Sequence, residues 1–324
     1  MINRLLSISH LVGNTPLVTL DHEAINLFAK LEYNNLMGSV KMRAAYYILK
    51  QAIERGDITE NTTVIESTSG NFGVALATLC KRLGITFIPV VDPNISPIYE
   101  NLLHAFSYQV VKVTERDETG GFLLTRIQKI KELCQSTKNS FWTNQYGNID
   151  CFWAHYHGLG EEIATHFDEL DYAFIGVSSG GTISGVSRRL KEKFPQIKII
   201  AVDSEGSVIF GDQPKKRYIP GIGSSMVPDL LKEAVIDEVI HVPEEKTIEG
   251  CYQLFENHAI FGGGSSGTSY YAITHYFKDK LFEKSPNVVF LVPDNGMAYV
   301  NTVYDKQWAD QLHQSTNELV TTRK

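Results

Sequence analysis

The feature of this sequence that most limits its fold is an alternation of short, β-branched runs with longer amphipathic stretches. Apolar runs predict strands over residues 27–32, 62–66, 85–91, 108–113, 172–177, 197–203 and 288–292. Helical spacing predicts helices from Pro97 and over 73–83, 122–133, 183–193 and 247–258. This alternation predicts an α/β fold with mainly parallel twisted sheets flanked by helices. In such sheets, ligands bind in the loops at the carboxyl ends of the strands.

Composition and charge limit the classes of function. A chain of 324 residues can bury a large core in one or two domains, and no stretch rich in Pro, Gly or Ser forms a linker. The net charge of -7 argues against nucleic acid or an anionic membrane as the main partner, because both need basic patches. The N-terminus lacks a signal-peptide core, no apolar run is long enough to span a membrane, and the four cysteines are scattered. We therefore expect a reduced, cytoplasmic protein with free thiols.

Three segments rich in Gly, Ser and Thr are candidate anion sites, and each is predicted to lead from a strand into a helix. They cover residues 67–73, 178–185 and 262–267. Glycine lets backbone amides approach an anion, and a helix N-terminus adds the positive end of its dipole. One such segment alone could equally be a capped turn, whereas three together favour the binding of phosphates or carboxylates. The spacing matches neither the dinucleotide fingerprint nor the P-loop, so those nucleotide sites are disfavoured.

A fourth segment, residues 35–43, places Lys41 at the predicted start of a helix. The helix dipole disfavours a cation there, which would help to keep the amine neutral and nucleophilic. Schiff-base chemistry needs such an amine. A lysine near a helix end is also commonly just solvated, so this feature is weak by itself.

Taken in order, the four segments resemble the cysteine synthase family of fold-type-II pyridoxal 5'-phosphate (PLP) enzymes, which have a tryptophan synthase β-like fold. Residues 38–43, Gly-Ser-Val-Lys-Met-Arg, resemble the family's Gly-Ser-x-Lys-Asp-Arg, whose lysine carries the cofactor as a Schiff base. Residues 67–73 and 178–185 resemble its substrate-carboxylate loop and its phosphate cup. The similarity runs from Gly13 to Asp294, which is most of the chain.

The resemblance implies a role for each matched residue. Lys41 would be catalytic, and a neutral Ser265 at the pyridine nitrogen fits β-elimination and replacement rather than transamination. The implied cofactor contacts are Lys41, Asn71 (ring hydroxyl), Ser179, Gly180, Gly181 and Thr182 (phosphate) and Ser265. The implied substrate contacts are Thr68, Ser69, Gly70, Asn71, Gln145 and Gly221.

Further motifs resemble one branch of the family, which joins O-phospho-L-serine to the amine of L-glutamate through an aminoacrylate. The product, N-(2-amino-2-carboxyethyl)-L-glutamate, is a precursor of 2,3-diaminopropionate in siderophores and peptide antibiotics. The branch motifs lie at 66–71, 91–97, 120–127, 144–146, 155–158 and 206–212. The alternatives are a cysteine synthase or cysteine β-lyase that uses sulfide or a thiol, and a weakened PLP-binding paralogue.

The resemblance also implies two domains and a homodimer. The larger, PLP-binding domain is expected to comprise residues 1–40 and 146–324, and the smaller, mobile domain residues 41–145. Two departures stand out, because the family's Asp beside the lysine is Met42 and the Pro of its Asn-Pro-x-Gly is Leu36. Losing the acid removes a charge that could orient Arg43.

Five other residues each allow two interpretations. Arg126 could pair with a phosphate or second carboxylate, and Arg217 could face an acidic substrate, although solvent-exposed arginines would look the same. His155-x-His157 has the spacing of a metal site but lacks further ligands nearby, and we expect no metal. Cys151 has no identifiable base and is expected to behave as a small hydrophobe.

Overall fold

The computed structural model describes residues 1–68, 70–118 and 120–312, and it contains two sheets. The first has the order β1-β2-β10-β7-β8-β9, with bounds Leu17–Leu20, Asn26–Leu31, Asn287–Val292, Tyr172–Gly176, Lys198–Ser204 and Glu238–Val242. The second has the order β5-β4-β3-β6, with bounds Val111–Lys112, Thr86–Val91, Thr63–Ser67 and Ser140–Trp142. Every neighbouring pair is parallel except β1 with β2. The predicted α/β class is therefore confirmed.

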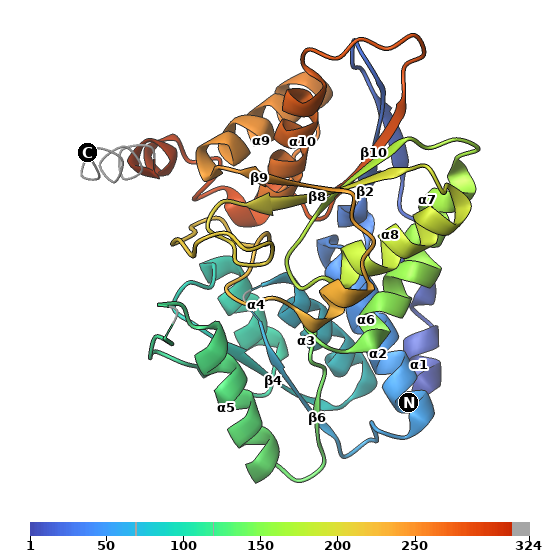
Figure 1. Ribbon diagram of the computed structural model, residues 1–324. Coiled ribbons are helices and arrows are strands. Elements are labelled where there is room, and N and C mark those ends of the chain that lie inside the picture. The colour runs from blue at the N-terminus through green and yellow to red at the C-terminus, as the bar shows by residue number, and fades with distance from the viewer. Residues whose placement is uncertain (69, 119, 313–324) are drawn as a thin grey trace.

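Helices connect the strands and cover both sheets (Figure 1). The α-helices are α1 Ile2–Leu6, α2 Lys41–Arg55, α3 Asn71–Leu83, α4 Pro97–Phe106, α5 Leu123–Ser136, α6 Ile149–Ala154, α7 Glu161–His166, α8 Gly181–Lys193, α9 Glu244–His258 and α10 Gly264–Phe277. A π-helix, η4 His155–Gly160, joins α6 to α7. The 3-10 helices are η1 Ser9–Leu11, η2 Glu32–Asn34, η3 Leu36–Gly38, η5 Asp229–Glu233 and η6 Gly296–Tyr299.

The central strand β10 shows why the parallel architecture forms. Its run from Val288 to Val292 is at most 3% exposed, because strands pair with it on both edges and layers pack on both faces. A continuous apolar strand of this kind is typical of a parallel sheet. Lys41 begins α2 as predicted, and the strand predictions at 62–66, 85–91, 172–177, 197–203 and 288–292 agree with β3, β4, β7, β8 and β10.

Two local predictions were wrong. The strand predicted over 108–113 is too long: β5 covers only Val111–Lys112 at the edge of the sheet, and beyond it the N–H of Val113 still donates to the carbonyl of Val91 in β4. The glycine-rich segment 262–267 does not leave a strand: it follows α9, and Gly262 only bridges Asn295 before α10 begins. The anion-site argument for that segment therefore depends on the start of α10 alone.

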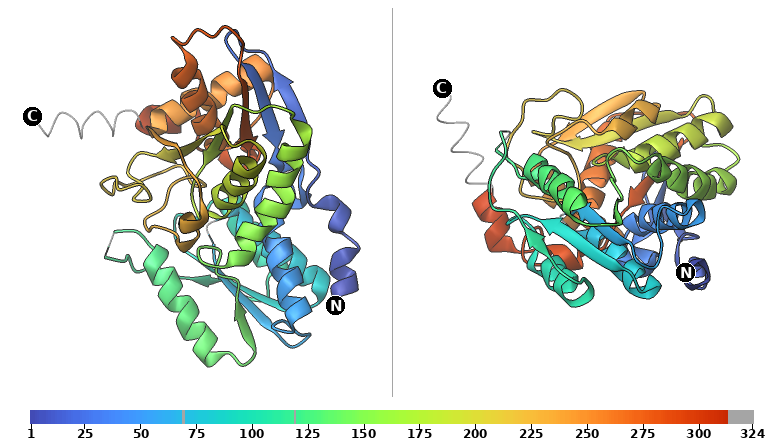
Figure 2. Two further views of the ribbon diagram at one scale, coloured as in Figure 1. Left: turned by 45° about the vertical axis from the view of Figure 1, so that its right-hand side comes forward. Right: turned by 90° about the horizontal axis from the view of Figure 1, so that it is seen from below.

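The two sheets lie in two lobes (Figures 1 and 2). Each lobe has its own buried apolar residues. The four-stranded sheet lies within the predicted smaller domain, and α2 and α3 supply much of its core. Leu5 of α1 belongs to that same core, so the N-terminal helix packs beside α2 rather than on the six-stranded sheet. The domain bounds themselves remain a prediction.

Two negative findings apply to the residues that the structure describes. None of their helices combines the length and the apolar character needed to cross a membrane. All four cysteines are free, and Cys80, Cys151 and Cys251 are buried.

Candidate active site

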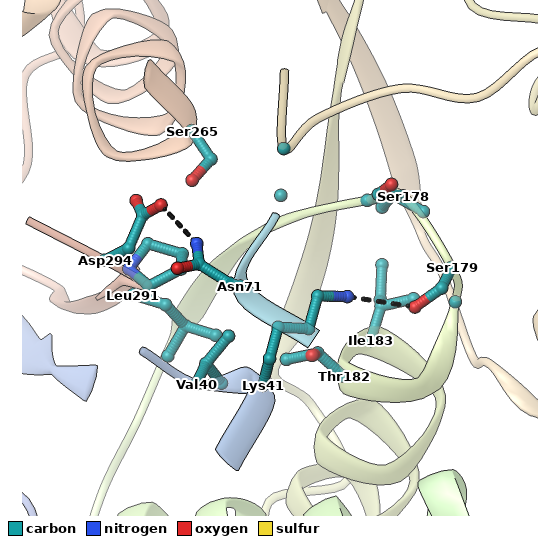
Figure 3. A pocket seen from close by; sticks show the side chains of 15 residues that line it. Val40, Lys41, Asn71, Ser178, Ser179, Thr182, Ile183, Ser265, Leu291 and Asp294 are labelled. Atoms are coloured by element: carbon teal, nitrogen blue, oxygen red, sulfur yellow. Dashed lines mark hydrogen bonds between the residues drawn. The ribbon is translucent and has the colours of Figure 1, made fainter. Parts of the chain in front are cut away.

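A pocket opens between the two lobes, at the carboxyl ends of β7 and β10 (Figure 3). Its walls come from the starts of α2, α3, α8 and α10 and from the loop after β10. The lining residues are Val40, Lys41, Asn71, Gly176, Val177, Ser178, Ser179, Gly180, Thr182, Ile183, Gly221, Ser265, Leu291, Pro293 and Asp294. The carboxyl edge of a parallel sheet is where ligands of α/β proteins bind.

Lys41 extends from the first residue of α2 into this pocket. Its Nζ lies 3.1 Å from Oγ of Ser179 and donates to it (Figure 3). Burial lowers the pKa of Lys41, and the weaker influences of Cys151, Asp294 and Glu66 oppose that shift. A larger fraction of the amine is therefore neutral near neutral pH, which is the form that attacks a carbonyl carbon.

The loop from Ser178 to Thr182 forms the wall that faces Lys41. Gly180 has φ +84°, a conformation that favours glycine, and it ends the loop just before α8. Among the described residues no side chain caps α8, so the N–H groups of its first turn can bind an anion. Ser179, Gly180 and Thr182 line the pocket, and Gly181 lies behind them, where a Cβ atom would come within 2.9 Å of Cβ of Cys151.

His155 lies behind this loop and not in a metal site. Its Nε2 is 3.3 Å from Oγ1 of Thr182, and burial lowers the pKa of the imidazole to about 3, so the ring is neutral. The described residues contain no group of three or more His, Cys, Asp or Glu side chains that could hold a metal ion. His157 is outside the pocket and stacks on Trp153.

Asn71 and Ser265 lie on the side of the pocket opposite the loop of Ser179 (Figure 3). Nδ2 of Asn71 donates to Oδ2 of Asp294 at 2.7 Å, and the hydroxyl of Tyr99 donates to Oδ1 of Asn71 at 2.7 Å. Ser265 is 5% exposed and lies in the first turn of α10. The first turns of three helices, which carry Lys41, Asn71 and Ser265, thus surround one space.

Hydrogen bonds to Thr68 hold the shape of the loop that is predicted to bind the substrate carboxylate. Oγ1 of Thr68 accepts hydrogen bonds from the N–H groups of Gly70 at 3.2 Å and Gly73 at 2.9 Å, and Thr68 is 1% exposed. Gly73 has to be glycine there, because a Cβ atom would lie 2.3 Å from Cγ2 of Thr68. The Thr68 hydroxyl is therefore used to shape the loop. Ser69 lies outside the described residues.

Gln145 is linked to this loop directly and also through Glu66, whose carboxylate accepts from the N–H of Gln145. Nε2 of Gln145 donates to the carbonyl of Ser67 at 3.0 Å, and the Glu66 carboxylate accepts from the N–H of Ser67 at 2.7 Å and from the hydroxyl of Thr143. Glu66 is fully buried, and burial raises its pKa to about 7. One buried acid thus joins the two segments that are predicted to hold the substrate carboxylate.

Arg126 and Arg217 come from opposite lobes, and the charge of each influences the pKa of Tyr146. Burial raises the pKa of Tyr146, while the charges of Arg126 and Arg217 oppose that shift. Arg126 is 7% exposed, with Nε 3.2 Å from Oδ2 of Asp92, so it is not a solvated surface arginine. Nη1 of Arg217 donates to the carbonyl of Gly206 at 2.6 Å, and burial lowers its pKa.

The structure thus brings together Lys41, Asn71, Ser179, Gly180, Thr182, Gly221 and Ser265 around one pocket. Thr68, Gly70, Gln145, Arg126 and Arg217 lie outside its walls, although Gly70 immediately precedes Asn71. Asp294 and Ser178 line the pocket but were not predicted as site residues. The signal for Asp294 was its place directly after a buried apolar strand, where parallel sheets carry functional side chains.

Comparisons with known proteins show the family and the fold. Residues 8–294 match the family model described as pyridoxal-phosphate dependent enzyme. The chain is 41% identical over 314 residues to an N-(2-amino-2-carboxyethyl)-L-glutamate synthase from Ralstonia nicotianae, covering 94% of this chain and 91% of that protein. An O-acetylserine dependent cystathionine beta-synthase from Helicobacter pylori superposes with a TM-score of 0.83 at 30% identity, covering 91% of this chain and 97% of that one. A hydrogen sulfide-producing enzyme from Fusobacterium nucleatum gives 0.86 at 28% identity, covering 94% and 93%.

Proposed function

Because the chain belongs to the family of pyridoxal-phosphate dependent enzymes, and within it to the cysteine synthase-like β-replacement enzymes, we propose that it joins O-phospho-L-serine to L-glutamate. The C–O bond to phosphate at the β-carbon breaks and a C–N bond to the α-amine of glutamate forms. The products are N-(2-amino-2-carboxyethyl)-L-glutamate and inorganic phosphate. Support for this product comes from the relative in Ralstonia nicotianae, whose name states that it synthesises N-(2-amino-2-carboxyethyl)-L-glutamate.

The residues of the pocket fit the cofactor. A lysine with a lowered pKa faces three features suited to a phosphorylated aldehyde: the hydroxyl of Ser179, the Gly180 turn and the uncapped start of α8. Lys41, Asn71, Ser179, Gly180, Gly181, Thr182 and Ser265 would hold it. When bound, PLP supplies an electron sink that stabilises negative charge at the α-carbon of an amino acid.

The roles of the chain's own residues follow from their positions. The amine of Lys41 lies in the pocket and would remove and return the α-proton of the substrate. The loop of Thr68 and Gly70, together with Gln145, would hold the α-carboxylate, with Glu66 joining the two segments. Closure of the lobes on that carboxylate would exclude water, which otherwise favours deamination.

The observation that supports an acidic pair of substrates is that the charges of Arg126, which is buried, and Arg217, which is partly buried, both oppose the raised pKa of Tyr146. Arg126 comes from α5 of one lobe and Arg217 from the loop after β8 of the other. A phosphate leaving group and the side-chain carboxylate of glutamate both need such partners. Sulfide and simple thiols do not.

Mass spectrometry of the products tests the proposal. The purified enzyme with O-phospho-L-serine and L-glutamate is expected to form N-(2-amino-2-carboxyethyl)-L-glutamate, and O-acetyl-L-serine with sulfide is the contrast. Faster formation of cysteine than of the glutamate adduct would favour the second candidate, a sulfide- or thiol-using enzyme, which the structural relatives support. Bound cofactor without turnover of any pair would indicate a weakened paralogue. The homodimer, the cytoplasmic location and a role in siderophore biosynthesis remain predictions.

A further inference from the structure

Four side chains form a hydrogen-bonded row across the boundary between the two lobes. The hydroxyl of Tyr99 donates to Oδ1 of Asn71 at 2.7 Å, and Nδ2 of Asn71 donates to Oδ2 of Asp294 at 2.7 Å. The hydroxyl of Tyr299 donates to the same Oδ2 of Asp294 at 2.9 Å. Tyr99 and Asn71 belong to the lobe of the four-stranded sheet, while Asp294 and Tyr299 follow β10 of the other sheet.

The chemistry of this row fixes which end of the Asn71 amide is which. A hydroxyl can donate or accept, so Tyr99 suits either end of an amide. An ionised carboxylate can only accept, so Asp294 requires the nitrogen of Asn71 on its side. Asp294 uses one of the two N–H bonds of that nitrogen, and the other remains for a ligand in the pocket that Asn71 lines.

Asp294 is built into this position. It is 4% exposed and lines the same pocket as Lys41. Its Oδ1 has no hydrogen-bond partner among the described residues, and burial raises its pKa to about 6, so it is mainly ionised at pH 7.5. Gly263 leaves the space it occupies, because a Cβ atom there would lie 2.1 Å from Oδ1 of Asp294. Burying a charge costs free energy unless hydrogen bonds compensate for it. Asp294 accepts two such bonds, from Asn71 and Tyr299.

We propose that Asp294 is a positioning residue for the cofactor: its carboxylate holds the Asn71 amide in one orientation, with an N–H directed at the ring oxygen of bound PLP. The proposal depends on the family and its cofactor, and not on the identity of the second substrate. Asp294 acts through Asn71 and forms no part of the proton transfer assigned to Lys41.

A double-mutant cycle tests this coupling. Asp294→Asn keeps the shape and one hydrogen bond, but an amide facing an amide is satisfied in either orientation, so the constraint on Asn71 is lost. We expect D294N and Asn71→Ala each to raise the dissociation constant of PLP about tenfold, the size of one lost hydrogen bond, and to shift the visible absorbance band of the bound cofactor. The double variant is expected to match N71A within about twofold, because the effect of D294N requires Asn71.

Two further measurements separate positioning from a structural role. Tyr99→Phe removes the other hydrogen bond of Asn71 but leaves the carboxylate, so its effect on the band and on PLP affinity is expected to be clearly smaller than that of D294N. Urea unfolding of the cofactor-free variants reports any loss of fold, and Asp294→Ser replaces D294N if the latter does not fold. Equal effects of D294N in the presence and absence of Asn71, or an effect of Y99F as large as that of D294N, would overturn the proposal.

Discussion

The guanidinium of Arg43 is paired with the carboxylate of Glu32 through two hydrogen bonds, Nε to Oε2 at 2.6 Å and Nη2 to Oε1 at 2.8 Å. Arg43 is 4% exposed and Glu32 is fully buried. A second carboxylate, Glu162, binds Nη1 at 2.6 Å and also the amine of Lys30 at 2.7 Å. Arg43, two residues after the lysine, is thus oriented by acids from other parts of the chain, and residue 42 has no part in it.

We expect Glu32→Gln to destabilise the protein by about 3–5 kcal/mol, because it removes one charge of a buried pair and leaves Arg43 undercompensated. Chemical denaturation measures the free energy of unfolding. Glu238→Gln is the matched control: Glu238 pairs with Lys198 at 3.3 Å on the surface, where a pair contributes about 1 kcal/mol or less. Similar losses for the two variants would contradict the assignment of Arg43 as a buried structural cation.

Met42→Asp, which restores the family residue, is expected to destabilise the protein by about 3 kcal/mol or more and not to increase turnover. Met42 is fully buried in the core that also contains Leu49 and Leu76, and a carboxylate would be desolvated there. Met42→Leu, of similar volume, is the control and should cost under about 1.5 kcal/mol. A stable M42D enzyme with faster turnover would show instead that Met42 weakens the chemistry.

The fold was predictable from the sequence wherever one residue pattern decided the structure. The apolar run of β10 and the alternation of strands and helices required a parallel sheet, and the lysine at the start of α2 marked the site. Partners that depend on tertiary contacts were not predictable. The sequence suggested that Met42 leaves Arg43 without a charge, but Glu32 and Glu162 are 11 and 119 residues away.

The residues of the active site also divide into those that could be predicted from the sequence and those that could not. Residues in glycine-rich segments could be found because each segment contains its own geometry, as in the turn at Gly180. Asp294 was missed because its place after a buried strand is only a weak local signal, and its proposed role depends on Asn71, which is 223 residues away. Thr68 was predicted to contact substrate, and its hydroxyl accepts a hydrogen bond from the backbone of its own loop. The residue types in the loop do not reveal this contact.

Lys41→Ala is expected to abolish turnover and the visible band of covalently held cofactor, whereas Lys50→Ala, on the same helix but paired with Glu54 at the surface, should retain both. The rate at which the cofactor-free enzyme attaches PLP should also level off well below pH 10.5, since burial lowers the pKa of Lys41 and only the neutral amine reacts. Stopped-flow absorbance from pH 6 to 10 measures this rate. Turnover by K41A would exclude the role of this lysine.

The raised pKa of Glu66 leads to a prediction about how the stability of the protein depends on pH. Its pKa is raised from 4.5 to about 7 by burial, so between these values the folded protein binds a proton that the unfolded chain releases. The contribution of Glu66 to stability therefore falls as pH rises through this window, by up to about 3 kcal/mol, and is constant above it. The difference in unfolding free energy between the wild type and Glu66→Gln, measured by urea denaturation at pH 4.5 to 8, should fall accordingly. A difference that does not change with pH would show that Glu66 is ionised throughout.

Gly180→Ala and Gly56→Ala form a matched pair that isolates the phosphate loop. Both glycines have positive φ, +84° and +83°, so both substitutions carry the same backbone strain of about 1–2 kcal/mol. A Cβ atom at Gly56 has nothing within 4 Å, whereas at Gly180 it would lie 3.2 Å from Pro228 and 3.3 Å from the backbone N of Leu231. The loop at Gly180 would have to move away from η5 to relieve these contacts, and the anion site at the start of α8 would move with it. We therefore expect G180A to weaken PLP binding about tenfold or more and G56A to leave it unchanged, as measured by equilibrium dialysis of the cofactor-free proteins. Equal affinities for the two variants would indicate that the phosphate binds elsewhere.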